Sequence, residues 1–584
     1  MPTLRTLLAL LVATGALGMI AAAPQSEPPV APTSGFTGTI GTTLGDSTPA
    51  LLPVVRAPEG SPNVIYILFD DVGFSDFQPY GSEIATPTID SLAQSGLRYT
   101  NFHTAAICSN TRAALLTGRN PHSVGMKDLT GPDRGFPNSR GRIPPTAATI
   151  AQILGSRGYS TAALGKWHLT PEADTGENSP RIDWPLGKGF DYFYGFHGGQ
   201  TDQFHPTLIQ DNHAIEIPNR AGYHFSEDLV DRAISTLRHG RESDPTRPFF
   251  MYLAFSTVHT PIQAPRAYVE KYLGKYEAGW DALRTSRLDR QIAMGIVPAG
   301  TTLPPRNPGD RAWDALSADE KVVYARYMAV YAAFIEHADA QVGRLVAYLK
   351  ASGQFDDTLI VLASDNGAPP ESGPQGAFTY PYGDVGRLSI ADSLARLDDL
   401  GTARSMPLYQ REWAMSSVTP FRMYKLSAYA GGVRDPLIVS WPRRIAARGD
   451  IRRQFVNVID ITPTVLDVTG IAAPGSYQGV RQMAMHGRSI APTFASADAP
   501  DPRETQYFEL RGHRAIWHDG WRAVATHRNG TPWDADTWEL FDARRDPAET
   551  TDLSAKDPAR LKQLQDLWWR EARTYGVLPL TERR

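Results

Sequence analysis

Short, continuously apolar runs separated by helical patterns fill the chain from residue 63 to residue 470. The first run, 63–69 (NVIYILF), is rich in β-branched and aromatic side chains, which is typical of a strand buried on both faces. Further strand-like runs cover residues 159–164, 248–256, 358–363 and 436–441, and helical patterns cover residues 88–96, 146–158 and 318–352. Helices that alternate with short apolar strands predict an α/β domain over 63–470, with a large mixed β-sheet flanked by helices.

The pattern changes beyond residue 470. A loop-rich passage is followed by four strand-like stretches at 504–510, 515–518, 521–526 and 538–541, and then by a helical pattern over 558–576. Strands that follow one another at short spacing and are closed by one helix are typical of an α+β arrangement. We therefore predict a smaller C-terminal α+β domain with an antiparallel sheet over 471–584.

The N-terminus has the layout of an export signal. Arg5 precedes an uncharged apolar run from Leu7 to Ala23 that ends in small residues, so residues 1–23 are predicted to be a cleaved signal peptide. A membrane anchor is the alternative, but the run is short for a span of roughly 20 residues and rich in Ala and Gly. We expect an exported protein, periplasmic or secreted, without stable membrane insertion after cleavage. Residues 24–62 are rich in Pro, Thr, Ser and Gly, which favours an extended arm or linker.

Composition narrows the class of protein further. The chain has 584 residues, 42% of them apolar and 21% charged, which is ordinary for a globular enzyme. The net charge is −4 and the basic residues are scattered, so we expect no nucleic-acid partner. Cys108 is the single cysteine, which excludes an intrachain disulfide. A lone thiol in an exported protein is buried and inert, reactive, or modified.

Two acidic pairs stand directly after strand-like runs. Asp70 and Asp71 follow the run 63–69, and Asp365 and Asn366 follow the run 358–363. Ligands collect at the carboxyl ends of strands in open α/β sheets, and adjacent carboxylates repel one another unless a cation lies between them. Each pair alone fits a helix cap or a turn. Both together favour one shared site for a hard divalent cation.

Cys108 precedes an apolar segment that reads as a helix ending at Gly118, so it would lie at a helix N-terminus, which favours anions. Arg112 would lie one turn further along. The alternative for a lone cysteine is a small core residue. Four further polar residues follow strand-like or turn segments, and each alone would be read as structural: Lys166, His168, His259 and Lys425.

Taken together, these residues resemble the type I sulfatases, the formylglycine-dependent, arylsulfatase-like family of the alkaline-phosphatase-like superfamily. The segment 108–119 (CSNTRAALLTGR) resembles the family signature, with Asn110 where the family has Pro or Ala. Asp70 and Asp71 resemble the first metal pair, and 165–168 (GKWH) resembles the second signature. The remaining family positions follow in the same order: His259, Asp365, Asn366 and Lys425. The resemblance runs from residue 63 to the C-terminus.

The resemblance implies a cofactor, a modification and a set of roles. Cys108 would be converted to formylglycine (3-oxoalanine) by a maturation enzyme that reads the local motif. One Ca²⁺ per chain, favoured over Mg²⁺, would be held by Asp70, Asp71, Asp365, Asn366 and the modified Cys108. Arg112 and Lys166 would orient the aldehyde hydrate. His259 and Lys425 would contact the sulfate, with His259 protonating the leaving oxygen, and His168 would accept the proton of the second hydroxyl.

The expected reaction is hydrolysis of a sulfate monoester, carried by a small molecule or a glycan. Two alternatives remain open. A phosphate or phosphonate ester hydrolase on the same fold would have a similar site. A non-catalytic binder of sulfated ligands would result if Cys108 stays unmodified. Several aromatic residues of the loops could stack on a substrate ring or pack in the core, among them Trp184 and Trp413.

Overall fold

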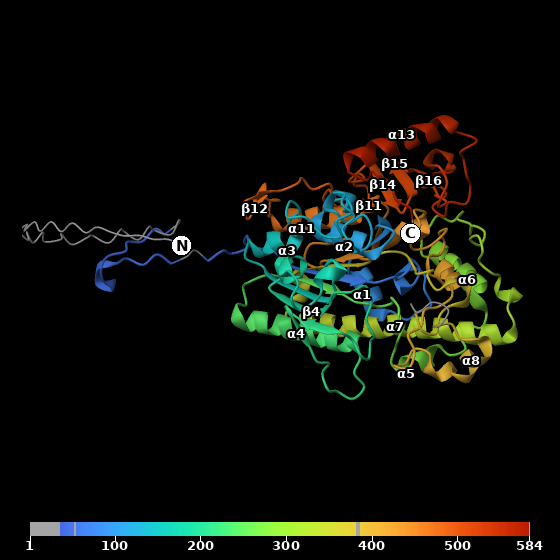
Figure 1. Ribbon diagram of the computed structural model, residues 1–584, viewed down its shortest axis with the longest axis horizontal. Helices are drawn as coiled ribbons and strands as arrows, with labels where there is room; N and C mark the ends of the chain where they lie inside the picture. The colour runs from blue at the N-terminus through green and yellow to red at the C-terminus, as the bar shows by residue number, and fades with distance from the viewer. Residues whose placement is uncertain (1–35, 52–53, 381–385, 583–584) are drawn as a thin grey trace, which may run out of the picture. The chain divides into compact units, whose positions relative to one another are not determined.

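The computed structural model describes residues 36–51, 54–380 and 386–582, coloured along the chain in Figure 1. The chain forms two compact units, Met1–Val54 and Val55–Arg584. In the first unit, the described residues form a 3-10 helix at Leu44–Asp46 and an antiparallel bridge between Thr39 and Thr48. The predicted signal peptide, residues 1–23, lies outside the described residues. The elements named below all belong to the second unit.

An 11-stranded sheet forms the centre of that unit. In spatial order its strands are β10 (Asp450–Arg452), β2 (Leu97–His103), β9 (Arg434–Ser440), β8 (Thr358–Ser364), β1 (Asn63–Phe69), β7 (Phe249–Ala254), β3 (Ser160–Lys166), β4 (Tyr192–Phe196), β5 (Leu208–Gln210) and β6 (His213–Ile215), with β11 (Val456–Asn457) paired to β2. The strands from β8 to β4 are parallel, whereas β9 is antiparallel to both neighbours and β5 and β6 are antiparallel at the far edge. The prediction of a mixed sheet is confirmed.

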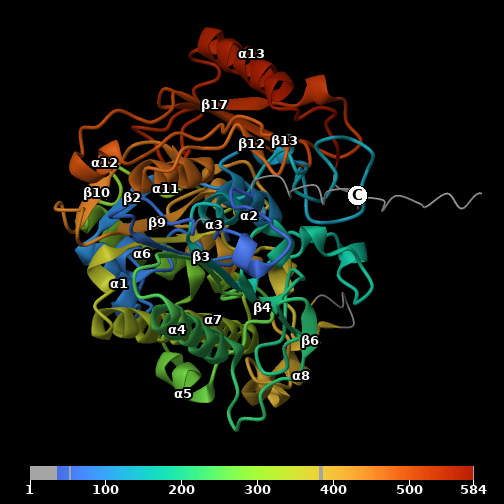
Figure 2. The same cartoon turned by 90° about the vertical axis from the view of Figure 1, so that its left-hand side faces the viewer.

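Helices cover both faces of the sheet. Alternate side chains of its central strands point to opposite faces, and because both sets are apolar, each face must be shielded from water. Ile65, Ile67 and Phe69 of β1 belong to one apolar core, and the intervening residues of β1 belong to another. The first core includes residues of α1 (Pro87–Ser95), α4 (Phe225–Ser243), α6 (Gly279–Ala293) and α7 (Ala318–Ala351). The second includes residues of α2 (Cys108–Thr117), α3 (Ile150–Gly155) and α11 (Ile461–Thr469). Figures 1 and 2 show α4 and α7 on the side opposite α2, α3 and α11.

Local sequence sets the ends of these helices. At the start of α7, Ser317 and Glu320 form a capping box, in which each side chain bonds the backbone N–H of the other residue. The helix predicted over 146–158 is shorter in the structure, because Thr149 and Gln152 form the same motif and start α3 at Ile150. Short helices also occur at α5 (Arg266–Val269), α8 (Ile390–Ala395), α9 (Arg411–Ser417), α10 (Ala430–Val433) and α12 (Pro492–Ala495).

A four-stranded antiparallel sheet lies near the C-terminus, as predicted. Its strands follow one another as β14 (Thr505–Leu510), β15 (His513–His518), β16 (Trp521–Ala525) and β17 (Trp538–Asp542). The final helix α13 (Pro558–Thr574) packs on this sheet through the fully buried Trp568. A separate two-stranded ribbon is formed by β12 (Ser476–Tyr477) and β13 (Val480–Arg481). Within the described part of the chain, no helix is long and apolar enough to cross a bilayer.

Candidate active site

Residues far apart in sequence meet at the carboxyl edge of the central parallel strands. Asp70 follows β1, Asp365 follows β8, and Lys166 is the last residue of β3. Because β8, β1, β7 and β3 are parallel neighbours, their carboxyl ends lie at the same edge of the sheet. Cys108 is the first residue of α2, which ends at Gly118 with φ 65°, a left-handed backbone angle suited to glycine. The structure therefore brings together the candidates that the sequence placed at separate strand ends.

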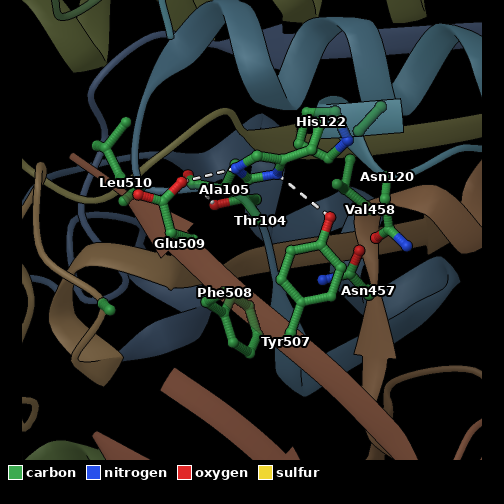
Figure 3. Close-up of a pocket in the computed structure, with 14 residues that line it drawn as sticks. Thr104, Ala105, Asn120, His122, Asn457, Val458, Tyr507, Phe508, Glu509 and Leu510 are labelled. Carbon is green, nitrogen blue, oxygen red and sulfur yellow. Dashed lines mark hydrogen bonds and ion pairs between the residues drawn. The ribbon is translucent and has the colours of Figure 1, made fainter. Parts of the chain in front are cut away.

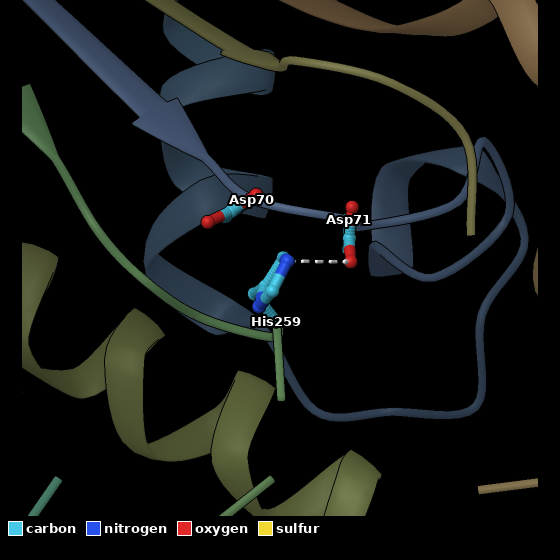
Figure 4. Close-up of side chains that lie close together, drawn as sticks. All are labelled: Asp70, Asp71 and His259. Atoms are coloured by element: carbon cyan, nitrogen blue, oxygen red, sulfur yellow. Dashed lines mark ion pairs between the residues drawn. The ribbon is translucent and has the colours of Figure 1, made fainter. Parts of the chain in front are cut away.

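The carboxylates form a buried acidic cluster. Asp70 and Asp71 have at most 1% exposure, and Figure 4 shows His259 beside them. One ligand atom from each of these three residues lies within 4.8 Å of the others, and His259 Nε2 is 3.8 Å from Asp71 Oδ2. Asn366 donates from Nδ2 to Asp71 Oδ1 at 2.6 Å, and Asp365 Oδ1 accepts from the Asp71 N–H at 3.3 Å.

Each of the three aspartates has its own buried cation. Lys166 Nζ lies 2.7 Å from Asp70 Oδ2, and Lys425 Nζ lies 2.8 Å from Asp71 Oδ1. Arg112 donates from Nε and Nη2 to Asp365 Oδ2 at 2.9 and 2.7 Å. These short, charge-assisted contacts compensate the desolvation of groups that would otherwise be very costly to bury.

Arg112 is further fixed by two neutral acceptors. Its Nη1 donates to the Lys166 carbonyl at 3.0 Å and to the Tyr252 hydroxyl at 3.1 Å. The side chain is fully buried, so its orientation is determined by these bonds and by Asp365. Tyr252 was not identified from the sequence, because it stands inside the apolar strand β7 and reads as a core residue.

The donor set fits a hard divalent cation. Asp70 Oδ1 and Asn366 Oδ1 are buried and make no hydrogen bond to any described residue, so two oxygen ligands are available beside Asp71. Burial and the nearby Asp365 raise the pKa of Asp70. Burial also opposes ionisation of Asp71, but Lys425 and His259 outweigh it and hold the pKa of Asp71 below its usual range. A carboxylate pair in which one member resists ionisation is stabilised by added positive charge.

Cys108 faces His168 across the site. Its Sγ lies 3.2 Å from His168 Nδ1, and the Ser109 hydroxyl donates to the His168 carbonyl at 3.0 Å. Burial raises the pKa of the Cys108 thiol, although Lys166 and Lys425 act in the opposite direction. Burial and the surrounding cations hold the pKa of His168 well below 6.5. At neutral pH, therefore, the thiol is protonated and the imidazole is neutral.

A further acid, Glu371, completes the cluster on the side of Lys425. Its Oε1 lies 2.9 Å from Lys425 Nζ, and its side chain is 18% exposed. Glu371 was not identified from the sequence; the only available signal is its position in the loop that follows Asp365 and Asn366. The neighbouring His259 is held largely neutral, because burial lowers its pKa to about 3 despite the opposing effect of Asp71.

Asn110, where the sequence departs from the family signature, makes one hydrogen bond in the interior, while its buried Oδ1 has no partner among the described residues. The residue is fully buried in the first turn of α2, and its Nδ2 donates to the Lys127 carbonyl at 3.0 Å. The side chain therefore ties the helix that carries Cys108 to the loop that follows residue 124.

Comparison with known proteins identifies the family. The sequence model of the Sulfatase family matches residues 62–471, and that of the N-sulphoglucosamine sulphohydrolase C-terminal region matches residues 422–571. An uncharacterised sulfatase of Schizosaccharomyces pombe is 33% identical over 534 residues, which cover 88% of this chain and 94% of the relative. The arylsulfatase of Klebsiella aerogenes is 30% identical over 473 residues, which cover 78% and 96%.

Solved structures agree on the fold. The structure of Ps i-CgsB in complex with k-i-k-neocarrahexaose matches with a TM-score of 0.60 at 24% identity, covering 88% of this chain and 93% of that chain. Identity at that level supports the shared architecture alone. The match of the family across most of the chain, together with the curated relatives, settles the class of protein. The chain belongs to the sulfatase family, within the alkaline-phosphatase-like superfamily, and is an enzyme that hydrolyses sulfate esters.

Proposed function

We propose that this sulfatase acts through a formylglycine hydrate formed from Cys108, with one divalent cation held by Asp70, Asp71, Asp365 and Asn366. The observation that carries the proposal is the state of the cysteine. The thiol lies 3.2 Å from the His168 imidazole, and Lys166 and Lys425 favour its ionised form, yet burial outweighs them and raises its pKa, which makes it a weak nucleophile. Oxidation to an aldehyde by the maturation enzyme, followed by addition of water, would give the site a hydroxyl nucleophile that does not depend on thiolate formation.

The hydrate would supply one hydroxyl as nucleophile and a second hydroxyl whose deprotonation releases sulfate from the enzyme. The cation, when bound, would lower the pKa of the nucleophilic hydroxyl. Because the four proposed protein ligands are oxygen donors, Ca²⁺ or Mg²⁺ suits the site better than Zn²⁺, and the family resemblance favours Ca²⁺. Asp70 Oδ1 and Asn366 Oδ1 support this assignment, since both are buried without a hydrogen bond from a described residue.

His168 is proposed as the base that accepts the second proton. Its imidazole is neutral and its Nδ1 lies 3.2 Å from the Cys108 side chain, within reach of a hydroxyl at that position. Arg112 and Lys166, which are ion-paired with Asp365 and Asp70, are proposed to orient the hydrate.

His259 and Lys425 are proposed to hold the sulfate, with His259 protonating the leaving oxygen. Lys425 is charged at neutral pH, because Asp71 and Glu371 outweigh burial and raise its pKa. His259 is neutral without substrate, but a bound anion favours its protonated form. It would then carry a proton next to the leaving group.

The charge balance supports a singly charged ester as substrate. Asp70, Asp71 and Asp365 offset Lys166, Lys425 and Arg112, and Glu371 adds one negative charge. A divalent cation would reverse the net sign, and the anionic sulfate monoester would then neutralise the site. A phosphate or phosphonate ester hydrolase remains the nearest alternative reaction. A two-metal phosphatase would need ligands for a second ion, whereas the described residues contain a single His/Asp cluster compact enough to hold one.

We further propose that the natural ester is carried by a small molecule or a glycan, that a maturation enzyme modifies Cys108, and that residues 1–23 direct export to the periplasm or outside the cell. The first point is supported by the name of one relative, the arylsulfatase of Klebsiella aerogenes. The signal peptide rests on its apolar run and small-residue exit.

Mass spectrometry tests the proposal directly. Trypsin releases Cys108 in the peptide 99–112, and protein made in its own host should show the mass decrease of a thiol converted to an aldehyde. Across preparations, specific activity toward 4-nitrophenyl sulfate should rise in proportion to the aldehyde fraction, and Cys108→Ala should be inactive. Full activity in protein with only thiol would refute the proposal. Tight sulfate-ester binding without turnover by such protein would instead favour the non-catalytic binder.

A further inference from the structure

Glu371 places a negative charge beside the lysine that is proposed to hold the sulfate, and the family resemblance gives this acid no role. Its Oε1 lies 2.9 Å from Lys425 Nζ. The same ammonium lies 2.8 Å from Asp71 Oδ1. The single positive charge of Lys425 is therefore shared by two carboxylates, although one carboxylate is enough to form an ion pair with it. Glu371 is the acid in excess.

The backbone fixes Glu371 relative to Lys425. The Lys425 N–H donates to the Ala368 carbonyl at 3.1 Å, which joins the segment that carries the lysine to the loop after β8. Further along this loop, the Gly373 N–H donates to the Pro370 carbonyl at 3.0 Å and closes the turn that contains Glu371. The Glu371 side chain is only 18% exposed. A charge that is held in place in this way acts on a bound anion without first being reoriented.

The second carboxylate oxygen of Glu371 has no donor among the described residues. Oε2 is buried and makes no hydrogen bond to any of them. Glu509, which faces His122 in Figure 3, shows the contrasting arrangement. Its Oε2 lies 2.7 Å from His122 Nε2, and its Oε1 accepts from the Gly512 N–H at 2.8 Å. Because both of its oxygens are partnered, Glu509 fits a structural role, whereas the unpaired buried oxygen of Glu371 calls for another explanation.

The charges around the site indicate what the excess acid does. Three acidic residues offset three cations, so these side chains together carry no net charge: Asp70, Asp71 and Asp365 with Lys166, Lys425 and Arg112. With a divalent cation bound, this set alone would match a doubly charged anion. Glu371 removes one unit of positive charge from the balance, and the site then matches a singly charged ester.

Substrate and product differ by one unit of charge. A sulfate monoester is a monoanion, whereas the released sulfate is a dianion, and so is a phosphate monoester above about pH 7. An additional negative charge that meets Glu371 across Lys425 is disfavoured about ten- to a hundredfold at the polarity of a partly exposed site. The excess acid would therefore weaken the binding of each dianion more than that of the ester.

We propose that Glu371 sets the charge selectivity of the active site, by favouring monoanionic sulfate esters over dianionic phosphate monoesters and by weakening the binding of the sulfate product. The inference rests on the proposed function, because it takes Lys425 as a residue that holds the sulfate, and it adds a residue that determines specificity. Glu371 acts through the charge balance at Lys425 and does not touch the ester. A phosphonate monoester, which is a monoanion, is treated like the sulfate ester.

The test compares kcat/KM at about pH 8 for three 4-nitrophenyl esters. The sulfate and the phenylphosphonate are monoanions, and the phosphate is a dianion. Glu371→Gln keeps the shape of the side chain and removes its charge, whereas Glu371→Asp keeps the charge. Glu336→Gln is the matched control, because Glu336 of α7 also pairs with a lysine, Lys271, and is 15% exposed.

For Glu371→Gln we expect the ratio of kcat/KM for the phosphate to that for the sulfate ester to rise about ten- to a hundredfold. The ratio for the phenylphosphonate to the sulfate ester should stay within about threefold, and Glu371→Asp and Glu336→Gln should keep both ratios. Sulfate binding, measured by calorimetry at the same pH without any ester, should become at least about tenfold tighter in Glu371→Gln alone.

Unchanged sulfate binding in Glu371→Gln would overturn the inference. A rise for the phenylphosphonate equal to that for the phosphate would also overturn it, because the selection would then be by the reacting element. Equal losses on all three esters would mean that Glu371 only supports Lys425 or the fold, and would overturn it too. If phosphate turnover is below detection in every variant, sulfate binding alone decides. An aldehyde-bearing wild-type enzyme that turns over no sulfate ester would contradict the proposed function itself, whereas sulfate binding would still test the role of Glu371.

Discussion

Asp365 has two proposed roles, and the substitutions Asp365→Ala and Asp365→Asn distinguish them. It is a proposed metal ligand, and it is also the ionic partner of Arg112, with both side chains fully buried. Asp365→Ala removes the carboxylate and leaves Arg112 with Asp70 at 3.8 Å as its remaining acidic contact. Breaking a buried ion pair by removing one partner costs about 3–5 kcal/mol, and the residual contact with Asp70 places the expected loss near the lower end, about 3 kcal/mol.

Asp365→Asn keeps the shape and one acceptor oxygen while it removes the charge. We expect this variant to fold, but to bind the metal at least about a hundredfold more weakly and to lose activity in parallel, since even outer partners of metal ligands contribute about ten- to a hundredfold. Urea unfolding measures the stability of both variants, elemental analysis after gel filtration measures the metal, and 4-nitrophenyl sulfate measures turnover. Asp536→Ala is the control, because it breaks another buried Asp–Arg pair, with Arg514, in the C-terminal sheet. It should lose stability and keep metal and specific activity. Full metal occupancy and near wild-type turnover in Asp365→Asn would refute the site assignment.

Three further predictions concern residues outside the acidic cluster. Burial holds the pKa of His122 below 6.5 in the folded protein, so the unfolded chain binds a proton first and the free energy of unfolding falls as the pH drops below about 6.5. His122→Gln should therefore flatten the dependence of the melting temperature on pH in that range. An unchanged dependence would contradict the prediction. A Cβ on Gly199 would lie 2.9 Å from His168 Cε1, so the added methyl group of Gly199→Ala should displace the imidazole. We expect kcat for 4-nitrophenyl sulfate to fall at least about tenfold with little change in KM. A change in KM alone would argue against His168 as the base. Trp568→Ala should cost about 3–5 kcal/mol in urea unfolding, because this side chain of α13 is fully buried against the C-terminal sheet. A loss below about 1 kcal/mol would mean that the helix is not a stabilising part of the fold.

The fold was largely accessible from the sequence, because its central strands are buried on both faces. The run at β1 was predicted to the residue, and α7 was predicted to within one residue of its end. Strand β2 was missed, because Leu97–His103 mixes polar and apolar residues and pairs irregularly with β9. Helix α4 was not predicted either, because its apolar face is narrow and its exposed face is strongly charged.

Site residues could be predicted from the sequence only where a charged or polar side chain directly follows a strand. Asp70 and Asp365 carry that signal, and the family resemblance supplied the roles that spacing alone left open. Glu371 lies in a turn, where polar residues are the rule, so the sequence gives no reason to select it. Tyr252 is hidden for the opposite reason, because a tyrosine in an apolar strand reads as core. Such residues are recognised only when their three-dimensional partners, here Lys425 and Arg112, are known.

The apolar cluster around Cys108 has a consequence for the order of events during synthesis. Cys108 is 2% exposed and shares that cluster with Phe508, Leu510 and Trp517, which are made some four hundred residues later. The proposed maturation enzyme would reach the thiol only before those strands dock, so modification would have to precede the completion of folding. The proportion of active molecules would then depend on the rate of modification relative to the rate of folding, and would be fixed for the lifetime of each chain. Slower emergence of the C-terminal strands would favour the modified form, and rapid folding would preserve the thiol.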